Sequence, residues 1–436
     1  MVHKFFMALA LLLAASHLAP ALAASLLWHG STTIAEGRGE RGPWQQNNSR
    51  YDYVDDPTVA LNDQGDIHVA WVDQARKDVL FQRFSADGAR QMAQAVNVSR
   101  SPATFSWLPR VVVAPDDPNR IFIIWQEIIF SGGSHGGDIV FARSEDGGAT
   151  FSPPMNLSNS VGGDGKGRII REIWHNGSLD LIAGPGGALY AAWTEYEGAL
   201  WFARSLDGGY RFSLPQRLAG GGKAKPVRAP ALALGPGPTL YLAWTTGDDS
   251  AADIHLMQSG DGGDSFSAPI PVAPSKTYSD APKLAVDDAG TLHLVYAESL
   301  AGPIAPYQVR YTRSTNGGRS FDAPRDISAA QTGAAFPSLA VDAQGRLVVL
   351  WEQYPDHRQG PMGLGLVVSD DGGRSFGPPV LVPGSRDSAG GTNGSHQGLL
   401  MKKLAVNAAG ALAIVNSSLK QDDKSRVWLM RAQLAP

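Results

Sequence analysis

The octapeptide Ser144-Glu145-Asp146-Gly147-Gly148-Ala149-Thr150-Phe151 decides the fold of this chain, because four further copies follow it. The copies begin at Ser205, Ser259, Ser314 and Ser369, and all five have the form Ser-x-Asp/Asn-Gly-Gly-x-x-Phe. Their first residues lie 61, 54, 55 and 55 positions apart. A repeat of this length is typical of one four-stranded blade of a β-propeller, so the spacing predicts a ring of blades.

A second motif, two apolar runs joined by a tight Asp/Gly turn, runs in step with the octapeptide. Its clearest copy is Pro282 to Tyr296, in which Asp287, Asp288 and Gly290 lie between two β-like runs. This pattern predicts a β-hairpin. The chain holds seven such hairpins, the others being Pro57 to Trp71, Pro109 to Trp125, Ser178 to Trp193, Pro230 to Trp244, Pro337 to Trp351 and Lys403 to Asn416.

Each hairpin is followed by a third apolar run, then by the octapeptide and a fourth run, so every unit supplies four strands. We name them strands A to D from the axis outward. The small-residue run, such as Leu284-Ala285-Val286, is strand A because it suits crowding near the centre. The aromatic residue that ends strand B in most units, such as Trp125, is expected to pack between neighbouring blades.

The first and last units deviate in a way that predicts how the ring closes. The first carries the degraded octapeptide Ser85-Ala86-Asp87-Gly88-Ala89, and the last ends after its third strand, Arg426 to Leu434. The run Leu26 to Ala35 can supply the missing strand and cover the open sheet edge. The sequence therefore predicts an all-β, seven-bladed β-propeller with four antiparallel strands per blade, closed by the N-terminal strand, with six or eight blades as alternatives.

Composition limits the remaining possibilities. Residues 1–24 combine a short basic start, an apolar run and the segment Ala21-Leu22-Ala23, which together indicate a cleavable signal peptide. We therefore expect a secreted or periplasmic monomer whose residues 25–436 form a single propeller domain, without membrane insertion. The chain has no cysteine, which excludes disulfides and thiolate chemistry. A net charge of −4 argues against nucleic acid as a partner.

The third position of the octapeptide is interpreted as structural. Its side chain can accept hydrogen bonds from the backbone of its own turn, the glycines permit positive φ, and the phenylalanine anchors the turn in the apolar interior of the blade. Catalysis needs one convergent cluster, whereas these positions are spread around the ring. They are Asp146, Asp207, Asp261, Asn316 and Asp371.

With these repeats the chain resembles, over most of its length, the Asp-box (bacterial neuraminidase repeat) propellers of the sialidase superfamily. The resemblance implies that the octapeptides join strands C and D on the face opposite the active site. For a sialidase it also implies arginines that grip a carboxylate, an acidic acid/base residue and a Tyr/Glu nucleophile pair. No sialidase-type Arg-Ile-Pro segment is present, and the nearest segments are Pro109-Arg110-Val111 and Val227-Arg228-Ala229-Pro230.

Acidic residues recur just after the aromatic residue that ends strand B, and they are candidates for catalysis. If they ring the mouth of the propeller, two of them could act as acid and as base or nucleophile in glycoside hydrolysis. In the alternative, architectural interpretation, each binds amides of a neighbouring blade or pairs with Arg143, Arg204 or Arg313 on strand C. The acidic residues are Asp73, Glu127, Glu195, Glu298 and, one position earlier in its blade, Glu352.

Basic residues in the connections that enter strand A are expected to attract an acidic sugar, with arginine offering a bidentate grip. Solvated surface charge is the alternative. The substrate-binding candidates are Arg110, Arg171, Arg228, Trp174 and Asp73, and the wider basic group adds Arg168, Lys223, Lys225, Lys276, Lys283, Arg386, Lys402 and Lys403.

Two long connections, Asn156 to Ser178 and Pro383 to Lys403, are rich in glycine and each carries a histidine, His175 and His396. Long loops in a compact fold are often functional. His175, beside Trp174, and Tyr196, between two glutamates, are candidates for proton transfer. No spacing of histidines and carboxylates resembles a known ligand set, so neither a metal nor a cofactor is expected.

Three functions stay open. The first is an exported, sialidase-like glycoside hydrolase that acts on or recognises an acidic saccharide. The second is a non-catalytic propeller that binds a saccharide or a protein. The third is a polysaccharide lyase with Tyr or His as base and Arg as the group that neutralises a carboxylate. Hydrolysis predicts two carboxyl groups about 5 to 9.5 Å apart in one pocket, whereas a lyase predicts a His or Tyr beside an Arg.

Overall fold

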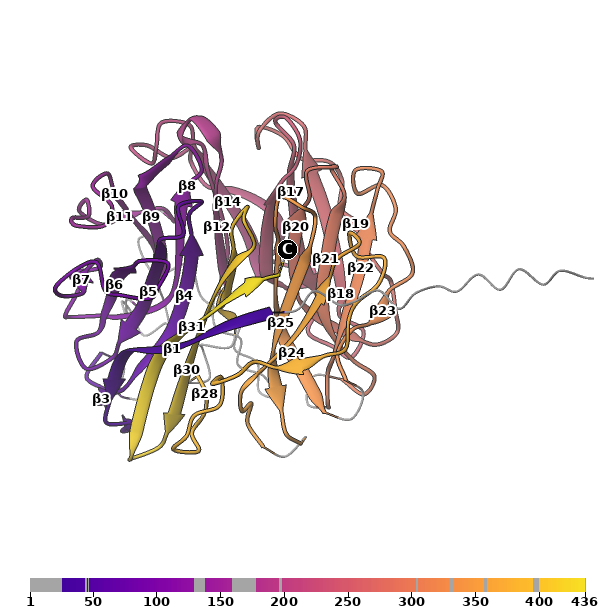
Figure 1. The fold of residues 1–436 in the computed structure, drawn as a ribbon. Helices are drawn as coiled ribbons and strands as arrows, with labels where there is room; N and C mark the ends of the chain where they lie inside the picture. Colours follow the sequence, from indigo (N-terminus) through magenta and orange to yellow (C-terminus); the bar gives the residue numbers. More distant parts are fainter. Residues whose placement is uncertain are drawn as a thin grey trace, which may run out of the picture.

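The computed structural model describes residues 26–43, 45, 47–128, 138–158, 178–195, 198–302, 305–329, 332–356, 359–394 and 400–435. Regular structure in these residues is almost entirely β, with one short 3-10 turn at Pro185–Gly187. Seven antiparallel sheets stand around an axis, which confirms the predicted seven-bladed propeller (Figure 1). No helix among the described residues is long and apolar enough to span a bilayer.

Blades 1 to 6 each contain strands A to D in sequence order, as predicted. Blade 1 holds β4 (Val54–Leu61), β5 (Ile67–Asp73), β6 (Asp78–Phe84) and β7 (Val96–Asn97). Blade 2 holds β8 (Phe105–Ala114), β9 (Asp117–Ile128), β10 (Asp138–Ser144) and β11 (Met155–Asn156). Blade 3 holds β12 (Leu179–Ala183), β13 (Leu189–Thr194), β14 (Ala199–Ser205) and β15 (Gln216–Gly220).

The next three blades repeat this order. Blade 4 holds β16 (Val227–Leu234), β17 (Leu240–Thr246), β18 (Asp253–Ser259) and β19 (Ile270–Pro271). Blade 5 holds β20 (Tyr278–Val286), β21 (Leu292–Ser299), β22 (Gln308–Ser314) and β23 (Arg325–Asp326). Blade 6 holds β24 (Gly333–Val341), β25 (Leu347–Tyr354), β26 (Leu364–Ser369) and β27 (Val380–Leu381).

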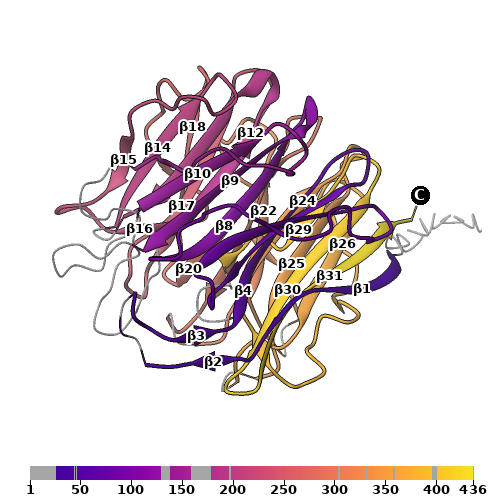
Figure 2. The ribbon, with the colours of Figure 1, turned by 90° about the vertical axis from the view of Figure 1, so that its left-hand side faces the viewer.

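Blade 7 joins the two ends of the described chain. Its inner strands are β29 (Leu404–Val406), β30 (Ala411–Lys420) and β31 (Lys424–Leu434), and its outer strand is β1 (Leu26–Gly37). β1 pairs antiparallel with β31, from Leu26 opposite Leu434 to Gly37 opposite Ser425 (Figure 2). This confirms the predicted ring closure. Two small additions lie beside it, the β28 bridge (Thr392–Asn393) to β30 and the hairpin of β2 (Glu40–Arg41) and β3 (Tyr51–Asp52).

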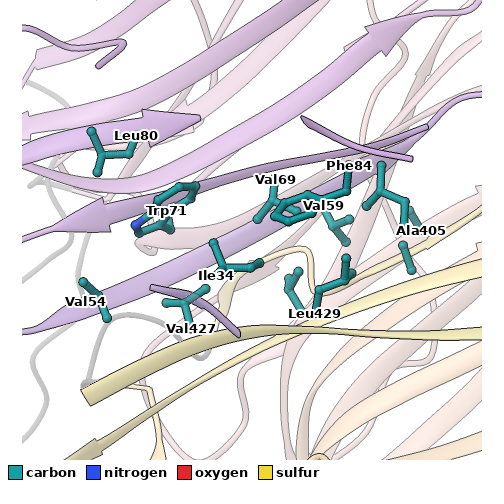
Figure 3. Packing of buried hydrophobic residues seen from close by; sticks show 13 residues of the cluster. Ile34, Val54, Val59, Val69, Trp71, Leu80, Phe84, Ala405, Val427 and Leu429 are labelled. Atoms are coloured by element: carbon teal, nitrogen blue, oxygen red, sulfur yellow. The ribbon is translucent and has the colours of Figure 1, made fainter. Parts of the chain in front are cut away.

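The apolar core lies between blades, because each sheet has to cover both of its faces with a neighbour. At the junction of blades 7 and 1, Trp71 packs with Val54 and Val69 of its own blade and with Val427 and Leu429 of β31 (Figure 3). The aromatic residue that ends strand B takes the corresponding place in other junctions, as predicted: Trp125, Trp193, Trp244, Tyr296 and Trp351.

The octapeptide turns connect strands C and D, and their polar groups are used within the turn. The Oγ of Ser259 donates to Asp261 at 2.6 Å, while the backbone nitrogen and the hydroxyl of Ser265 donate to the same carboxylate at 2.9 and 2.6 Å. These hydrogen bonds, led by that from Ser259, lower the pKa of Asp261. The same Ser-to-Asp or Ser-to-Asn bond recurs at Asp146, Asp207, Asn316 and Asp371. Their contacts are those of a structural turn.

The sequence suggested that the phenylalanine of the octapeptide packs inside its own blade, but the structure shows it packing against the preceding blade. Phe151 packs edge-on against Phe81 of the preceding blade with ring centroids 5.3 Å apart, and Phe212 packs in the same way against Phe141 at 5.0 Å. Position 148 (φ 88°) requires glycine, because a Cβ atom there would collide with the Phe81 ring. Each turn therefore fastens one blade to the one before it.

The arginines that end strand C reach the octapeptide of the following blade. Arg204 Nη1 donates to the Gly262 carbonyl at 2.6 Å, and Arg313 Nη1 donates to the Gly372 carbonyl at 2.7 Å. The guanidinium of Arg143 lies over the ring of Tyr210. The expected pairing of Arg143, Arg204 and Arg313 with the carboxylates after strand B is therefore wrong. Antiparallel register places the two groups at opposite ends of the blade.

A cavity of about 340 Å³ lies on the axis of the ring and is lined by strand A of all seven blades. Its walls carry small and branched apolar side chains, such as Val112 and Leu284, and Lys402 also lines it. We call the face where strands A begin and strands B end the mouth face. The octapeptides lie on the opposite face, because they follow the ends of strands C.

Strand A carries a β-bulge close to the mouth face in five blades, where the register of the A–B pair shifts. At each bulge a residue other than glycine has φ between 50° and 54°, and a proline follows it. A bulge bends its strand and redirects the side chains next to it. These residues are Asp56, Leu108, Ala229, Ala281 and Phe336.

Ring closure by β1 predicts a large difference between two substitutions on that strand. Ile34 is 5% exposed and packs in the junction of blades 7 and 1, whereas Leu27 is 54% exposed. Ile34→Ala should lower the free energy of unfolding by about 2–4 kcal/mol, as expected for a truncated core side chain. Leu27→Ala should change it by less than about 0.5 kcal/mol. Urea denaturation of both variants measures this, and equal effects would contradict the role of β1 in the core.

Candidate functional site

Charged side chains from three blades converge at the inner end of the mouth face. Arg110 of β8, Asp180 of β12 and Lys283 of β20 hold equivalent positions, each opposite the residue that precedes the strand-B aromatic. Arg110 and Lys283 line one small cavity of about 10 Å³, which has room for about one water-sized atom. These residues lie far apart in sequence, so ring closure creates the cluster.

Arg110 is the most deeply buried member of this cluster, with 3% of its surface exposed. Its Nε lies 3.3 Å from Asp180 Oδ1, and its Nη2 donates to the Leu179 carbonyl at 3.1 Å. No hydrogen-bond acceptor reaches its Nη1 among the described residues. Burial lowers the pKa of Arg110, although an arginine stays charged near neutral pH. A buried guanidinium nitrogen without an acceptor next to a cavity is suited to an anion.

Lys283 and Lys402 add two amines near Arg110, Lys283 lining the same small cavity and Lys402 lining the axial cavity. Burial, and next the charge of Arg110, lower the pKa of Lys283 to about 8. Burial also lowers the pKa of Lys402, and the charge of Asp180 partly offsets this decrease. No hydrogen bond or ion pair joins either side chain to another part of the described chain. Among the described residues, the carboxyl groups that act on these three cations are Asp180, Asp280 on the strand of Lys283 and, for Arg110, Asp56. We call Arg110, Lys283 and Lys402 the axial cations.

A second polar group lies beside them at the bulge of β20. Arg228 Nε donates to Asp280 at 3.1 Å, and its Nη2 donates to the Tyr278 hydroxyl at 2.6 Å. The rings of Tyr278 and Tyr307 meet edge to face with centroids 6.1 Å apart. Burial, with the nearby Asp280 carboxylate, raises the pKa of both phenols, so they keep their protons near neutral pH. Tyr307 is half-buried, whereas Tyr278 is fully buried.

Glu127 and Glu298, two predicted catalytic carboxylates, are buried and hold their own blades together. Glu127 accepts hydrogen bonds from Trp125 Nε1 at 2.9 Å and Ser106 Oγ at 3.0 Å, and burial raises its pKa. Glu298 accepts one from Thr277 Oγ1 at 2.8 Å and pairs with Arg310 at 3.1 Å. Both residues thus link strand B to adjacent strands. These contacts favour the architectural interpretation over an acid/base pair.

The remaining predicted residues are divided between other contacts and undescribed segments. Asp73 accepts backbone hydrogen bonds from Ala75 and Arg76 at 3.1 and 3.2 Å, and burial raises its pKa. Glu195 closes the turn after strand B through its backbone, since its nitrogen donates to the Ala199 carbonyl at 3.0 Å. The other candidates lie outside the described residues: Arg171, Trp174, His175 and Tyr196.

Of the predicted arginines, Arg110 lies at the axis and Arg228 next to it, whereas sequence reasoning gave no role to Asp180, Tyr278, Asp280 or Tyr307. Lys283 and Lys402 were members of a wider basic group only. One signal could have found the cluster. The position of Arg110, Asp180 and Lys283 in the hairpin motif is also charged in blade 7, at Lys403, and carries small residues in the other three blades, Thr58, Ala231 and Ser338.

A buried ion pair lies between blades 6 and 7, apart from the axial cations. The Nζ of Lys403 pairs with Glu352 Oε1, and Asn393 Nδ2 donates to Glu352 Oε2 at 2.7 Å. Lys403 also donates to Asn416 at 3.0 Å. With 2% and 1% of their surfaces exposed, Lys403 and Glu352 are closed to a substrate. Their role is to fasten blade 7 to blade 6.

Asp56, at the bulge of blade 1, is a buried carboxyl group beside Asp55. Its Oδ2 accepts a hydrogen bond from the Leu108 nitrogen at 2.9 Å, which links blades 1 and 2. Burial, and next the Asp55 carboxylate, raise the pKa of Asp56. No group of three or more metal-binding side chains occurs among the described residues.

Comparisons with known proteins place the fold. No family model and no curated protein match the chain. An ulvan lyase of a polysaccharide lyase family, solved bound to -[GlcA(1-4)Rha3S]-, aligns with a TM-score of 0.55 and 14% identity over 86% of this chain and 94% of its own. A GH93 α-L-arabinofuranosidase of Fusarium graminearum aligns at 0.50 and 15% identity, over 77% and 94%.

A protein of unknown function from Dyadobacter fermentans aligns at a TM-score of 0.52 and 14% identity, over 93% of this chain and all of its own. Sialidases also match, at TM-scores of 0.45 to 0.47. The solved neighbours thus include sialidases and a polysaccharide lyase. At identities this low, the similarity shows a shared fold and leaves the chemistry to this chain's own residues.

The raised pKa of Asp56 predicts that Asp56→Asn stabilises the protein at high pH. In the unfolded chain the carboxyl group ionises near pH 3.9. The folded protein resists that ionisation, so wild-type stability falls as pH rises from 4 toward the folded pKa. Asparagine keeps the acceptor for Leu108 and tolerates the φ of 52°.

Urea denaturation should therefore show Asp56→Asn to be more stable than wild type at pH 8, with the difference shrinking toward pH 4. The exposed control Asp63→Asn should show no such trend. A difference that is the same at both pH values would contradict the assignment.

The buried pair between blades 6 and 7 predicts non-additive substitutions. Lys403→Met leaves the Glu352 charge buried and should lower the free energy of unfolding by about 3–5 kcal/mol. Adding Glu352→Gln removes that charge, so the double variant should lose less than the sum of the two single variants. Exposed Lys225→Met is the control. Strictly additive losses in urea denaturation would show that the two side chains do not interact.

Proposed function

We propose that this propeller binds an acidic saccharide at the mouth face and cleaves it. The observation that carries the proposal is the convergence of the axial cations from three blades onto one place, where Arg110 Nη1 has no acceptor within the described chain. A carboxylate oxygen is small enough for the 10 Å³ cavity and would give Arg110 its missing acceptor. Lys283 and Lys402 would neutralise the remaining charge.

Among cleavage reactions, the described side chains favour β-elimination over hydrolysis. Neutralising the carboxylate of a uronic acid makes the adjacent C–H bond more acidic, and cations held in a partly dry site are suited to this. Lys283, whose pKa of about 8 leaves part of its amine neutral, can accept the proton from that C–H bond. Tyr307, half-buried and kept protonated by its surroundings, can donate a proton to the leaving oxygen. Hydrolysis needs two available carboxyl groups, whereas Glu127 and Glu298 are occupied by structural hydrogen bonds.

The ulvan lyase of similar fold is a precedent, because it was solved bound to a glucuronate-containing saccharide. Sialidase-like hydrolysis would instead need catalytic groups from residues such as Glu195, Tyr196 and His175. Binding without cleavage is the second candidate, and it is favoured by the structural role of Glu127 and Glu298. We further propose that residues 1–24 direct export and that residues 25–436 act as one domain.

Replacing the axial lysines should weaken binding of an acidic oligosaccharide. Lys283→Gln and Lys402→Gln should each raise Kd for an oligogalacturonate roughly tenfold, because each removes one charge-assisted contact. Lys225→Gln is the matched control, since this exposed lysine lies 3.9 Å from Asp249 in blade 4 and is not among the axial cations. Calorimetry on the exported protein measures binding. Mass spectrometry of its N-terminus checks the expected cleavage near residue 24.

Turnover is followed in the same samples by the ultraviolet absorbance of the unsaturated product. Absorbance that rises with wild type supports elimination. New reducing ends without that absorbance would indicate hydrolysis, and binding without either would indicate the non-catalytic propeller. A wild-type protein that binds no acidic saccharide, or the same Kd for Lys283→Gln, Lys402→Gln and Lys225→Gln, would contradict the proposed site.

A further inference from the structure

Lys283 differs in its surroundings from an ordinary surface lysine. It follows the bulge of β20, where the register shift between Asp280 and Lys283 turns its side chain toward the cavity that Arg110 also lines. The side chain is half-buried, and no hydrogen bond or ion pair holds its amine within the described chain. The amine therefore lies at a cavity with no partner to restrain its lone pair once it loses its proton.

The charges around Lys283 come from four other positions. Arg110 of β8 and Lys402, which precedes β29, disfavour its protonated form, while Asp180 of β12 and Asp280 of its own strand favour it. Burial is the largest influence, and the balance brings its pKa to about 8. An ordinary lysine has a pKa of about 10.4, so at pH 8 the neutral fraction of Lys283 is roughly a hundredfold larger.

The neighbours of Lys283 also supply a seat for an anion. Arg110 is buried and its Nη1 lacks an acceptor among the described residues, while Lys402 carries a second positive charge nearby. A small molecule with a carboxylate next to a carbonyl group could place one carboxylate oxygen in the small cavity on Arg110 and the other toward Lys402, with the rest of the molecule outside that cavity. Its carbonyl carbon would then face the amine of Lys283.

We propose that Lys283 is a nucleophilic amine that captures anionic carbonyl compounds, such as 2-oxo acids or the open-chain form of an acidic sugar, as a Schiff base. The proposal rests on the proposed function in one respect, since the same cations would seat the saccharide carboxylate. A lysine that is desolvated or placed beside another cation is activated for this chemistry. The chain offers this arrangement at Lys283, between Arg110 and Lys402.

The reaction balances without any further reagent. The lone pair of the neutral Nζ forms a bond to the carbonyl carbon, and the carbonyl π electrons move to its oxygen. Proton transfer from nitrogen to that oxygen gives a carbinolamine. Loss of the hydroxyl group with a proton, as one water molecule, leaves the C=N bond of the imine.

The test uses the full mature protein, glyoxylate as the probe and cyanoborohydride, which reduces an imine to a stable carboxymethyl-lysine. At pH 8, peptide mapping by mass spectrometry should show Lys283 labelled roughly tenfold faster than Lys225. Lowering the pH to 6 should slow labelling of Lys283 roughly fiftyfold, in line with the fall in its neutral fraction. Lys283→Arg keeps a positive charge there and should abolish this fast label with unchanged circular dichroism.

The seat for the carboxylate is tested separately with glycolaldehyde, a carbonyl probe without charge. Lys402→Gln should slow glyoxylate labelling of Lys283 more than glycolaldehyde labelling. Both probes meet less neutral amine once the charge of Lys402 is gone, but only glyoxylate also loses a cation for its carboxylate. Equal glyoxylate labelling of Lys283 and Lys225, or preferential labelling of Lys402, would overturn the proposal. Saccharide binding is measured without reductant, so lost labelling with retained binding rejects the Schiff base alone.

Discussion

Packing of each blade against the next is the constraint on which the rest of this structure depends. A four-stranded sheet with apolar side chains on both faces cannot leave either face in water, and here the strand-B aromatics and the octapeptide phenylalanines fill the spaces between blades. Only a closed ring covers every face, and β1 provides the final strand. Closure also forces seven strands A to a common axis. That geometry brings Arg110, Lys283 and Lys402 together from distant parts of the chain.

Much of this fold is predictable from the sequence, because each copy of a repeated motif indicates the same local structure. Five octapeptides and seven hairpin motifs gave the blade number, the strand order and the octapeptide turns between strands C and D. The shortened last unit and the orphan run Leu26 to Ala35 gave the closure. The inter-blade place of Phe151 and Gly148 was not predictable, since a motif in one blade does not reveal which side chain of another blade it meets.

The candidate site was less predictable for the same reason. A carboxylate that recurs after strand B shows where a residue lies, whereas its chemistry depends on its partners. Glu127 meets Trp125 and Ser106, and these contacts make it part of the sheet. The axial cations interrupt the repeat instead. At the position of Arg110 and Lys283 three blades carry small residues, so the fold does not require a charge there, and such places are where function is expected.

The two faces of the ring differ in which residues adopt positive φ, and therefore in backbone strain. On the octapeptide face, positive φ values fall on glycines, which adopt them without steric conflict. Near the mouth face, five residues with side chains hold φ between 50° and 54° before a proline, at a cost of roughly 1–3 kcal/mol each. The bulge that requires this strain precedes Arg110 and Lys283 and redirects them toward the axis. Among the described residues, the octapeptide face, where blades are fastened, therefore avoids strained side-chain-bearing residues, and the mouth face keeps them in five blades.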